Sequence, residues 1–177
     1  MLLLNLTRIR TAQERFEKVY EPGQLGNDPD FRVAAPVSLA FDIFKDKQQF
    51  RLVGQVRTTL ELNCSRCVEP FTLPVDAAFD LRYHPQGDNT GTGEAEQEIE
   101  DDDLTTAFYE KDQIDLGHLM HEQFVLALPM KPLCSTMCKG LCVHCGTNLN
   151  TASCDCAPQW TDPRLAALNE LRAKLNE

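Results

Sequence analysis

The chain has 177 residues, of which 42% are hydrophobic, and its formal net charge is −10 at neutral pH. The longest apolar stretch near its middle, Phe124–Leu128, is far too short to cross a bilayer, so we expect a soluble protein without a membrane partner. Tight nucleic-acid binding needs clustered Lys and Arg, so an acidic chain favours a basic protein partner. The N-terminus lacks the features of a secretory signal, which predicts a reducing, cytoplasmic location.

The first twenty residues predict a strand followed by a short helix. The leucine-rich segment 2–9 is typical of an opening strand. Thr11 and Glu14 have the spacing of a capping box, in which each side chain bonds to the backbone amide of the other residue. We therefore expect a helix over residues 12–20, ended by Pro22.

Three later segments, 37–43, 50–62 and 71–83, alternate apolar and polar residues with a period of two. This alternation is typical of strands with one buried face. Polar stretches at 45–49 and 64–70 would turn each strand into the next, which predicts an antiparallel sheet. The residues expected on its buried face are Val37, Leu39, Phe41, Ile43, Phe50, Leu52, Val56, Leu60, Leu62, Phe71, Leu73, Val75, Ala77, Phe79, Leu81 and Tyr83.

Residues 85–103 interrupt this pattern and are expected to form a loop. Its second half, Glu94–Asp103, carries seven carboxylates in ten residues, which is typical of a solvated acidic segment. The run Asp101–Asp103 lacks the glycine and the alternating ligands of a calcium loop, so a cation site is disfavoured there. The acidic segment is instead a candidate contact for a basic partner.

Two helices are expected after this loop. Residues 104–128 are expected to contain one, in which apolar side chains from Ile114 to Leu128 share a broad face and which Pro129 ends. His118 and His121 are spaced i, i+3, which could bring two metal ligands together, but ordinary surface histidines explain them better. The second helix starts at Asp162–Pro163, and its leucine stripe is expected to pack on the core.

All eight cysteines fall into closely spaced pairs. Short spacings let two thiolates from one turn bind the same ion. Gly146, directly after one pair, permits the tight backbone path of a zinc knuckle, so the C-terminal cluster is close to a small zinc ribbon. The pairs are Cys64 and Cys67, Cys134 and Cys138, Cys142 and Cys145, and Cys154 and Cys156.

Eight thiolates divide naturally into two zinc sites of four ligands each. In the preferred hypothesis the pairs at 142/145 and 154/156 hold one ion. The pairs at 64/67 and 134/138 hold a second ion, which clips the C-terminal segment onto the β-domain. The rival hypothesis is a single zinc with some cysteines spare. In either case four thiolates leave no open position for water, so the zinc is expected to be structural.

Other uses of the cysteines fit the sequence less well. A disulfide framework needs an oxidising compartment. A thioredoxin-type pair sits at a helix N-terminus, whereas Cys64 and Cys67 lie in a turn between strands. A catalytic cysteine needs a basic partner, and only His144 is near in sequence. Because phosphate-binding loops and nucleophile elbows are also missing, the sequence predicts no enzyme and no small-molecule substrate.

Several short motifs together form a recognisable set. They are a Cys-x-Arg-Cys hairpin within 61–71, the segments 114–116 and 126–134, the cysteine motifs at 138–142, 145–150 and 154–156, and Asp162-Pro163-Arg164. In this combination the chain resembles the YceD family, the large ribosomal RNA subunit accumulation proteins. The resemblance implies a role in accumulation, processing or stability of large-subunit ribosomal RNA in bacteria, with relatives in plastids. It implies no catalytic mechanism.

The fold class predicted is α+β. An antiparallel β-sheet domain with packing helices and the acidic loop 85–103 would occupy residues 1–130. A zinc-ribbon-like module and the C-terminal helix would occupy residues 131–177.

The leading functional hypothesis is a non-enzymatic ribosome-biogenesis factor. It would support synthesis, processing or stability of the ribosomal RNA through a ribosomal protein, an assembly factor or a pre-ribosomal particle. The first alternative is direct RNA binding by the zinc module, with a basic face of Lys131, Lys139 and Arg164 and with Trp160 for stacking. A thiol redox protein is less favoured.

Overall fold

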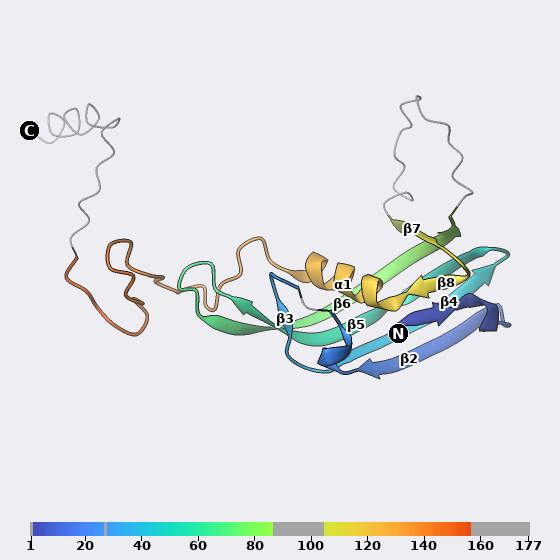
Figure 1. The fold of residues 1–177 in the computed structure, drawn as a ribbon, viewed down its shortest axis with the longest axis horizontal. Helices are drawn as coiled ribbons and strands as arrows, with labels where there is room; N and C mark the ends of the chain where they lie inside the picture. Colours follow the sequence, from blue (N-terminus) through green and yellow to red (C-terminus); the bar gives the residue numbers. More distant parts are fainter. Residues whose placement is uncertain (1, 27, 87–104, 157–177) are drawn as a thin grey trace, which may run out of the picture. The chain divides into compact units, whose positions relative to one another are not determined.

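The computed structural model describes residues 2–26, 28–86 and 105–156 (Figure 1). These residues form two compact units. The first contains the described residues of Met1–Cys64 and Glu69–Cys134, and the second those of Ser65–Val68 and Ser135–Glu177. The first unit contains every strand and helix of the described residues: β1 (Leu3–Asn5), η1 (Leu6–Arg8), β2 (Gln13–Tyr20), η2 (Pro22–Gln24), β3 (Arg32–Val33), β4 (Val37–Asp46), β5 (Gln49–Asn63), β6 (Pro70–Pro85), β7 (Thr106–Tyr109), β8 (Gln113–Asp115) and α1 (Leu116–Ala127), where η marks a 3₁₀-helix.

Most of the first unit is one six-stranded mixed sheet, ordered β2-β4-β5-β6-β7, with the short β3 paired to β5. The pairs from β2 to β6 are antiparallel, as the alternation predicts. The last pair differs, because β7 runs parallel to β6. A separate two-stranded sheet joins β1 to β8. The protein is therefore a sheet-dominated α+β fold.

The core lies on the sheet face that the sequence predicts. Val37, Leu39, Phe41 and Ile43 on β4 are at most 2% exposed, and Val56 and Leu52, which pair with Leu39 and Ile43 on β5, are equally buried. On β6 the burial is less even, since Val75, Phe79 and Tyr83 are buried whereas the alternating residues between them stay half-buried. Each fully buried side chain of this size contributes about 1.5–3 kcal/mol.

The helix predicted over residues 12–20 is wrong, because this segment is strand β2. Phe16 and Tyr20 are four residues apart, a spacing that fits one face of a helix and one face of a strand equally well. Pairing with β4 along eight residues decides the outcome, since it satisfies the backbone and stacks Phe16 on Phe41 at 4.9 Å between ring centroids. The Thr11 hydroxyl donates to the Gln13 carbonyl instead of capping a helix.

The one helix predicted within residues 104–128 is confirmed, and it occupies the second half of that segment. Residues 106–109 and 113–115 form β7 and β8, joined by a tight turn in which Lys111 and Asp112 have φ of 52° and 55°. Helix α1 then starts behind Asp115, whose carboxylate accepts hydrogen bonds from the amides of the first turn. It ends before Pro129, as expected. The opening strand is likewise shorter than predicted, since β1 gives way to the 3₁₀-helix η1.

Helix α1 lies beside β6 of the large sheet (Figure 1). Its apolar side chains belong to the same core as those of the sheet. Leu116, Leu119, Met120 and Phe124 are at most 2% exposed. It is the one α-helix among residues 2–26, 28–86 and 105–156, and no helix there is long and apolar enough to cross a membrane. The predicted C-terminal helix and the acidic segment lie outside the described residues.

Candidate metal centres

The eight cysteines gather into two groups of four. In each group the four sulfur atoms lie within 4.8 Å of one another. No disulfide joins any of these eight described residues. The groups have the membership of the preferred two-site hypothesis, and each could hold a metal ion. We call them the hairpin centre (Cys64, Cys67, Cys134 and Cys138) and the knuckle centre (Cys142, Cys145, Cys154 and Cys156).

The knuckle centre starts from a tight turn in the second unit. The Cys142 amide donates to the Thr147 carbonyl at 2.8 Å, and the Gly146 amide donates back to the Cys142 carbonyl at 2.9 Å. Gly146 has φ of 73°, the left-handed conformation that glycine adopts without a steric penalty. The His144 amide points at the Cys142 sulfur at 3.5 Å. This is the backbone path that the glycine in the sequence predicted.

A second turn brings the chain back toward the first. Leu141 and Asn148 form an antiparallel bridge, and the amides of Thr151 and Ala152 both donate to the Asn148 carbonyl. The Asn148 side chain accepts from the Asn150 amide at 3.0 Å, which closes a compact turn before Cys154. Local hydrogen bonds rather than apolar packing therefore shape this loop.

Hydrogen bonds lower the pKa of one thiol of the knuckle centre and raise the pKa of another. The hydroxyl and the amide of Thr147 lower the pKa of Cys145 to about 6. A hydrogen bond to Cys145, with burial and the charges of Cys145 and Cys142, raises the pKa of Cys156 to about 12. The thiols thus share protons that a divalent cation would displace, because the thiolate is the form that binds metal.

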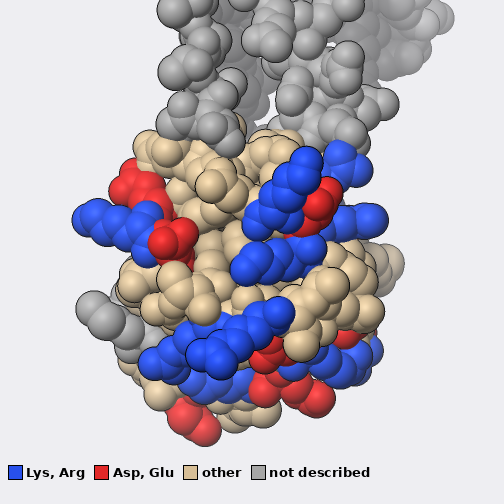
Figure 2. Space-filling view, turned by 90° about the vertical axis from the view of Figure 1, so that its right-hand side faces the viewer, with Lys and Arg blue, Asp and Glu red and all other residues tan. Residues whose placement is uncertain are grey.

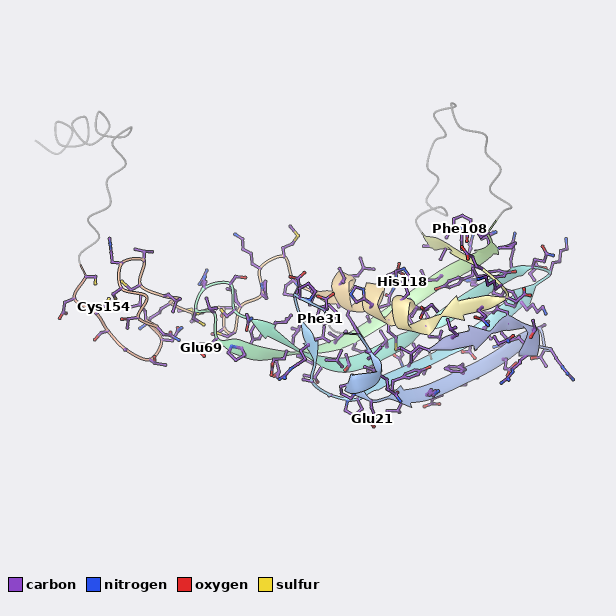
Figure 3. The ribbon with its side chains drawn as sticks, viewed as in Figure 1. Glu21, Phe31, Glu69, Phe108, His118 and Cys154 are labelled. Atoms are coloured by element: carbon purple, nitrogen blue, oxygen red, sulfur yellow. The ribbon has the colours of Figure 1, made fainter. Side chains whose placement is uncertain are left out.

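The hairpin centre begins where β5 turns into β6. The Cys64 amide donates to the Glu69 carbonyl at 3.0 Å and closes the turn, in which Val68 takes φ of 61° (Figure 3). Cys64 and Cys67 are 2% and 4% exposed. The turn between strands that the sequence predicts is therefore confirmed, and it buries both of its thiols.

Within the second unit, Arg66 holds the segment around Cys138 in place. Its guanidinium donates to the Cys138 carbonyl at 2.8 Å, and its own carbonyl accepts from the Leu141 amide at 3.1 Å. Gly140, with φ of 78°, makes this approach possible, since a Cβ there would lie 3.1 Å from the Arg66 carbonyl oxygen. The Asn150 side chain donates to the Cys138 sulfur at 3.3 Å.

The donor set fits a soft divalent cation. A tetrahedral zinc with Zn–S bonds of about 2.3 Å would separate its sulfurs by about 3.8 Å, which the observed clustering accommodates. The N–H groups of His144 and Asn150 that point at cysteine sulfurs match the outer hydrogen bonds that orient thiolate ligands. Which metal binds, and at which of the eight thiols, stays a prediction.

The residues proposed for RNA contact in the zinc module are only partly described. Lys131 is an exposed residue of the first unit and Lys139 an exposed residue of the second. Trp160 and Arg164 lie outside the described residues. The basic face therefore stays a prediction, as does the domain boundary at residue 130.

The two histidines of α1 are paired with carboxylates. His118 lies 3.1 Å from Glu122 on the same helix, and His121 lies 2.7 Å from Asp28 (Figure 3). Among the described residues neither histidine belongs to a cluster of metal-binding groups. Both are exposed side chains, in agreement with the interpretation as surface histidines. The Asp28 partner, which the sequence reasoning missed, is ninety-three residues away and carries no sequence signal.

Sequence reasoning also missed the groups that support the cysteines. Arg66, Thr147 and Asn150 contact ligand residues through a carbonyl or a sulfur atom. Their proximity in sequence to the cysteine pairs is the one signal that could have singled them out.

The part of the chain that contains all eight cysteines matches a known protein family. Residues 52–172 match the family model described as "Large ribosomal RNA subunit accumulation protein YceD". The chain belongs to the YceD family. No solved structure matches this YceD-family chain.

Two curated plant relatives of this YceD-family chain carry the name "Large ribosomal RNA subunit accumulation protein YCED homolog 1, chloroplastic". The protein from Arabidopsis thaliana is 28% identical over 84% of this chain and 52% of its own length. The protein from Zea mays is 32% identical over 70% of this chain and 50% of its own length. The chain thus spans about half the length of the curated relatives it matches.

Proposed function

We propose that this YceD-family chain is a non-enzymatic ribosome-biogenesis factor that supports the accumulation of large-subunit ribosomal RNA. The observation that carries the proposal is the match to the family model over residues 52–172, which includes all eight cysteines. The plant relatives bear the same functional name. A role in the reducing cytoplasm suits thiols that bind metal.

The cysteine groups support a structural part for zinc in this function. An ion held by four thiolates has no open coordination position, so it activates no water and polarises no substrate. We propose that one zinc occupies each centre. Each ion would fix the fold of its cysteine-bearing turns, and the chain would act by binding rather than by catalysis.

The proposed partner is a basic ribosomal protein or assembly factor, contacted by the acidic segment Glu94–Asp103. Its seven carboxylates offer a dense negative charge to such a surface. Deleting residues 94–103 should abolish capture of the protein partner from a nuclease-treated extract. A matched deletion within 85–93, which contains a single carboxylate, should leave capture intact.

Cells without the chain test the function itself. The ratio of large-subunit to small-subunit ribosomal RNA should fall and should return when the wild-type chain is restored. Cys142→Ser with Cys145→Ser should fail to restore the ratio, whereas Ser153→Ala, next to the same centre, should restore it. An unchanged ratio in cells that lack the chain would refute the proposed function.

A further inference from the structure

The net charge of the chain is concentrated in one segment. Residues 87–104 contain eight carboxylates and no Lys or Arg, which accounts for eight of the ten net negative charges. The rest of the chain has 19 carboxylates against 17 basic residues and is nearly neutral. An acidic total therefore does not exclude a phosphate-binding surface elsewhere on the molecule.

One end of the first unit is such a surface. Figure 2 looks onto this end, where Lys and Arg side chains gather with a smaller number of carboxylates among them. Five of its basic side chains are exposed and the sixth, on Arg82, is half-buried. We call this surface the basic end and define it by Arg10, Lys45, Lys47, Arg51, Arg82 and Lys111.

Hydrogen bonds bring these residues together from distant parts of the chain. The Lys45 ammonium donates to the Ile9 carbonyl at 3.2 Å, which places Arg10 beside the turn between β4 and β5. Lys47 occupies that turn. The Tyr109 hydroxyl donates to the Gln48 carbonyl at 2.9 Å and brings the β7–β8 turn, with Lys111, to the same end.

A groove of about 270 Å³ crosses the strands at this end. Phe44 on β4 lies opposite Arg51 on β5, which lies opposite Arg82 on β6, so the three side chains form one cross-strand row. Phe44 is 38% exposed. The groove thus combines an aromatic ring on β4 with guanidinium groups on β5 and β6, the two elements with which proteins hold a base and its phosphates.

Carboxylates neutralise only part of the positive charge at the basic end. Arg51 and Arg82 lie directly opposite each other, and like charges in that position are destabilising. Asp80 offsets this by accepting two hydrogen bonds from Arg51. Asp46 also lines the groove, and Glu110 and Asp112 lie on the β7–β8 turn beside Lys111.

Three of the cations have no carboxylate partner within residues 2–26, 28–86 and 105–156. They are Arg10, Lys47 and Lys111, none of which forms an ion pair there. Unpaired cations at the same end of the unit as an exposed ring fit a phosphodiester chain with accessible bases. Its phosphates would contact the cations, and an unpaired base would stack on the ring.

We propose that the basic end binds single-stranded RNA, with phosphates on its Lys and Arg side chains and a base stacked on Phe44. The choice of RNA rests on the proposed function in ribosomal RNA accumulation. The surface lies on the sheet rather than on the zinc module.

Fluorescence anisotropy with a labelled oligouridine of about 12 nucleotides tests this, using the full zinc-loaded chain in a series of salt concentrations. The triple variant R10Q/K47Q/K111Q should bind about tenfold more weakly at about 0.1 M salt, and its salt slope should be flatter by about 2. The control variant K18Q/R32Q/R57Q removes the same charge from exposed side chains of the first unit that lie outside the basic end. It should bind like the wild type.

Phe44→Leu separates stacking from charge. It should weaken binding by about fivefold without changing the salt slope, because it removes the ring and no cation. An RNA duplex of the same length should bind more weakly than the single strand, since its bases are hidden. Circular dichroism of each variant should match the wild type.

The proposal is overturned if the wild-type chain shows no salt-dependent RNA binding, or if both triple variants lose affinity equally. Its failure is distinct from that of the proposed function. If cells without the chain lose large-subunit ribosomal RNA although the purified chain binds no RNA, only the RNA surface is refuted. If the chain binds RNA but its loss leaves the ribosomal RNA ratio unchanged, only the proposed function is refuted.

Discussion

The two units of this chain bury different kinds of side chain. In the first unit, Phe41, Leu52 and Phe124 are almost completely shielded from water, together with about twenty other apolar residues. In the second unit the buried residues, among those described, are Cys67, Cys138 and Gly140. Its larger apolar side chains are half-buried or exposed, and Val143 is 89% exposed. The described side chains that this unit buries are thus two thiols, where the first unit buries apolar groups.

This difference shows how one chain can order two regions of unequal size. The first unit has enough apolar surface to offset the conformational entropy that folding costs. The described part of the second unit is about 26 residues, and regions of that size need metals, disulfides or partners to stay folded. We therefore expect the two units to respond to different perturbations.

Removing metal should have the largest effect, and it should unfold the second unit while the large sheet of the first unit stays folded. Structural zinc contributes about 10–16 kcal/mol in small zinc domains, because the ligands are unordered without it. Excess chelator should abolish amide-exchange protection around residues 138–151 and leave the amides of β4 and β5 protected. Protection that persists around residues 138–151 in metal-free protein would contradict the comparison.

Truncating a core side chain should have the opposite pattern. Phe41→Ala should lower the free energy of unfolding of the first unit by about 3–5 kcal/mol, because the ring is 1% exposed and leaves a cavity. Phe44→Ala, on the same strand but facing outward, should cost less than about 1 kcal/mol. Urea denaturation followed by circular dichroism measures both. Zinc content unchanged in Phe41→Ala would support separate sources of stability.

The N-terminal cap of helix α1 should contribute a smaller part of the stability of the first unit. Asp115→Ala removes the carboxylate that accepts from the amides of Gly117 and His118, and it should destabilise the first unit by about 1 kcal/mol. Asp115→Asn, which keeps a capping oxygen, should cost only a fraction of this. Equal losses in the two variants would show that capping is not the cause.

The smallest effect should depend on pH. The hydrogen bond from His121 lowers the pKa of Asp28 below its ordinary value of 3.8. A carboxyl whose pKa is lowered by folding adds stability above its unfolded pKa and loses it as pH falls through the folded pKa. Asp28→Asn should therefore cost at most about 1 kcal/mol at pH 7 and almost nothing below the folded pKa. Urea titrations at both pH values test this, and a cost that is independent of pH would refute it.

The parts predicted well from sequence are those set by short-range patterns. The alternation in β4 and β5 indicates strands because a half-buried sheet imposes a period of two, and the cysteine spacings indicate shared ligands because a thiolate reaches an ion only from a nearby turn. The predicted helix at residues 12–20 failed because Phe16 and Tyr20 fit both periods. Only the register with β4, a long-range pairing, resolves that ambiguity.

Other features depended on contacts that no local pattern contains. The basic end unites Arg10, Lys47 and Lys111 through hydrogen bonds between distant segments, whereas the net charge of the whole chain pointed to a basic protein partner. The parallel pairing of β7 with β6 and the Asp28–His121 pair are also long-range. Total charge is a poor guide when one short segment carries most of it.

Native mass spectrometry of the freshly purified chain tests the central claim most directly. If the hairpin and knuckle centres each hold one ion that orders the second unit, the mass should exceed that of the bare chain by two zinc ions. Cys142→Ser with Cys145→Ser should retain one. A wild-type chain that carries a single zinc, or none with its thiols reduced, would contradict the account.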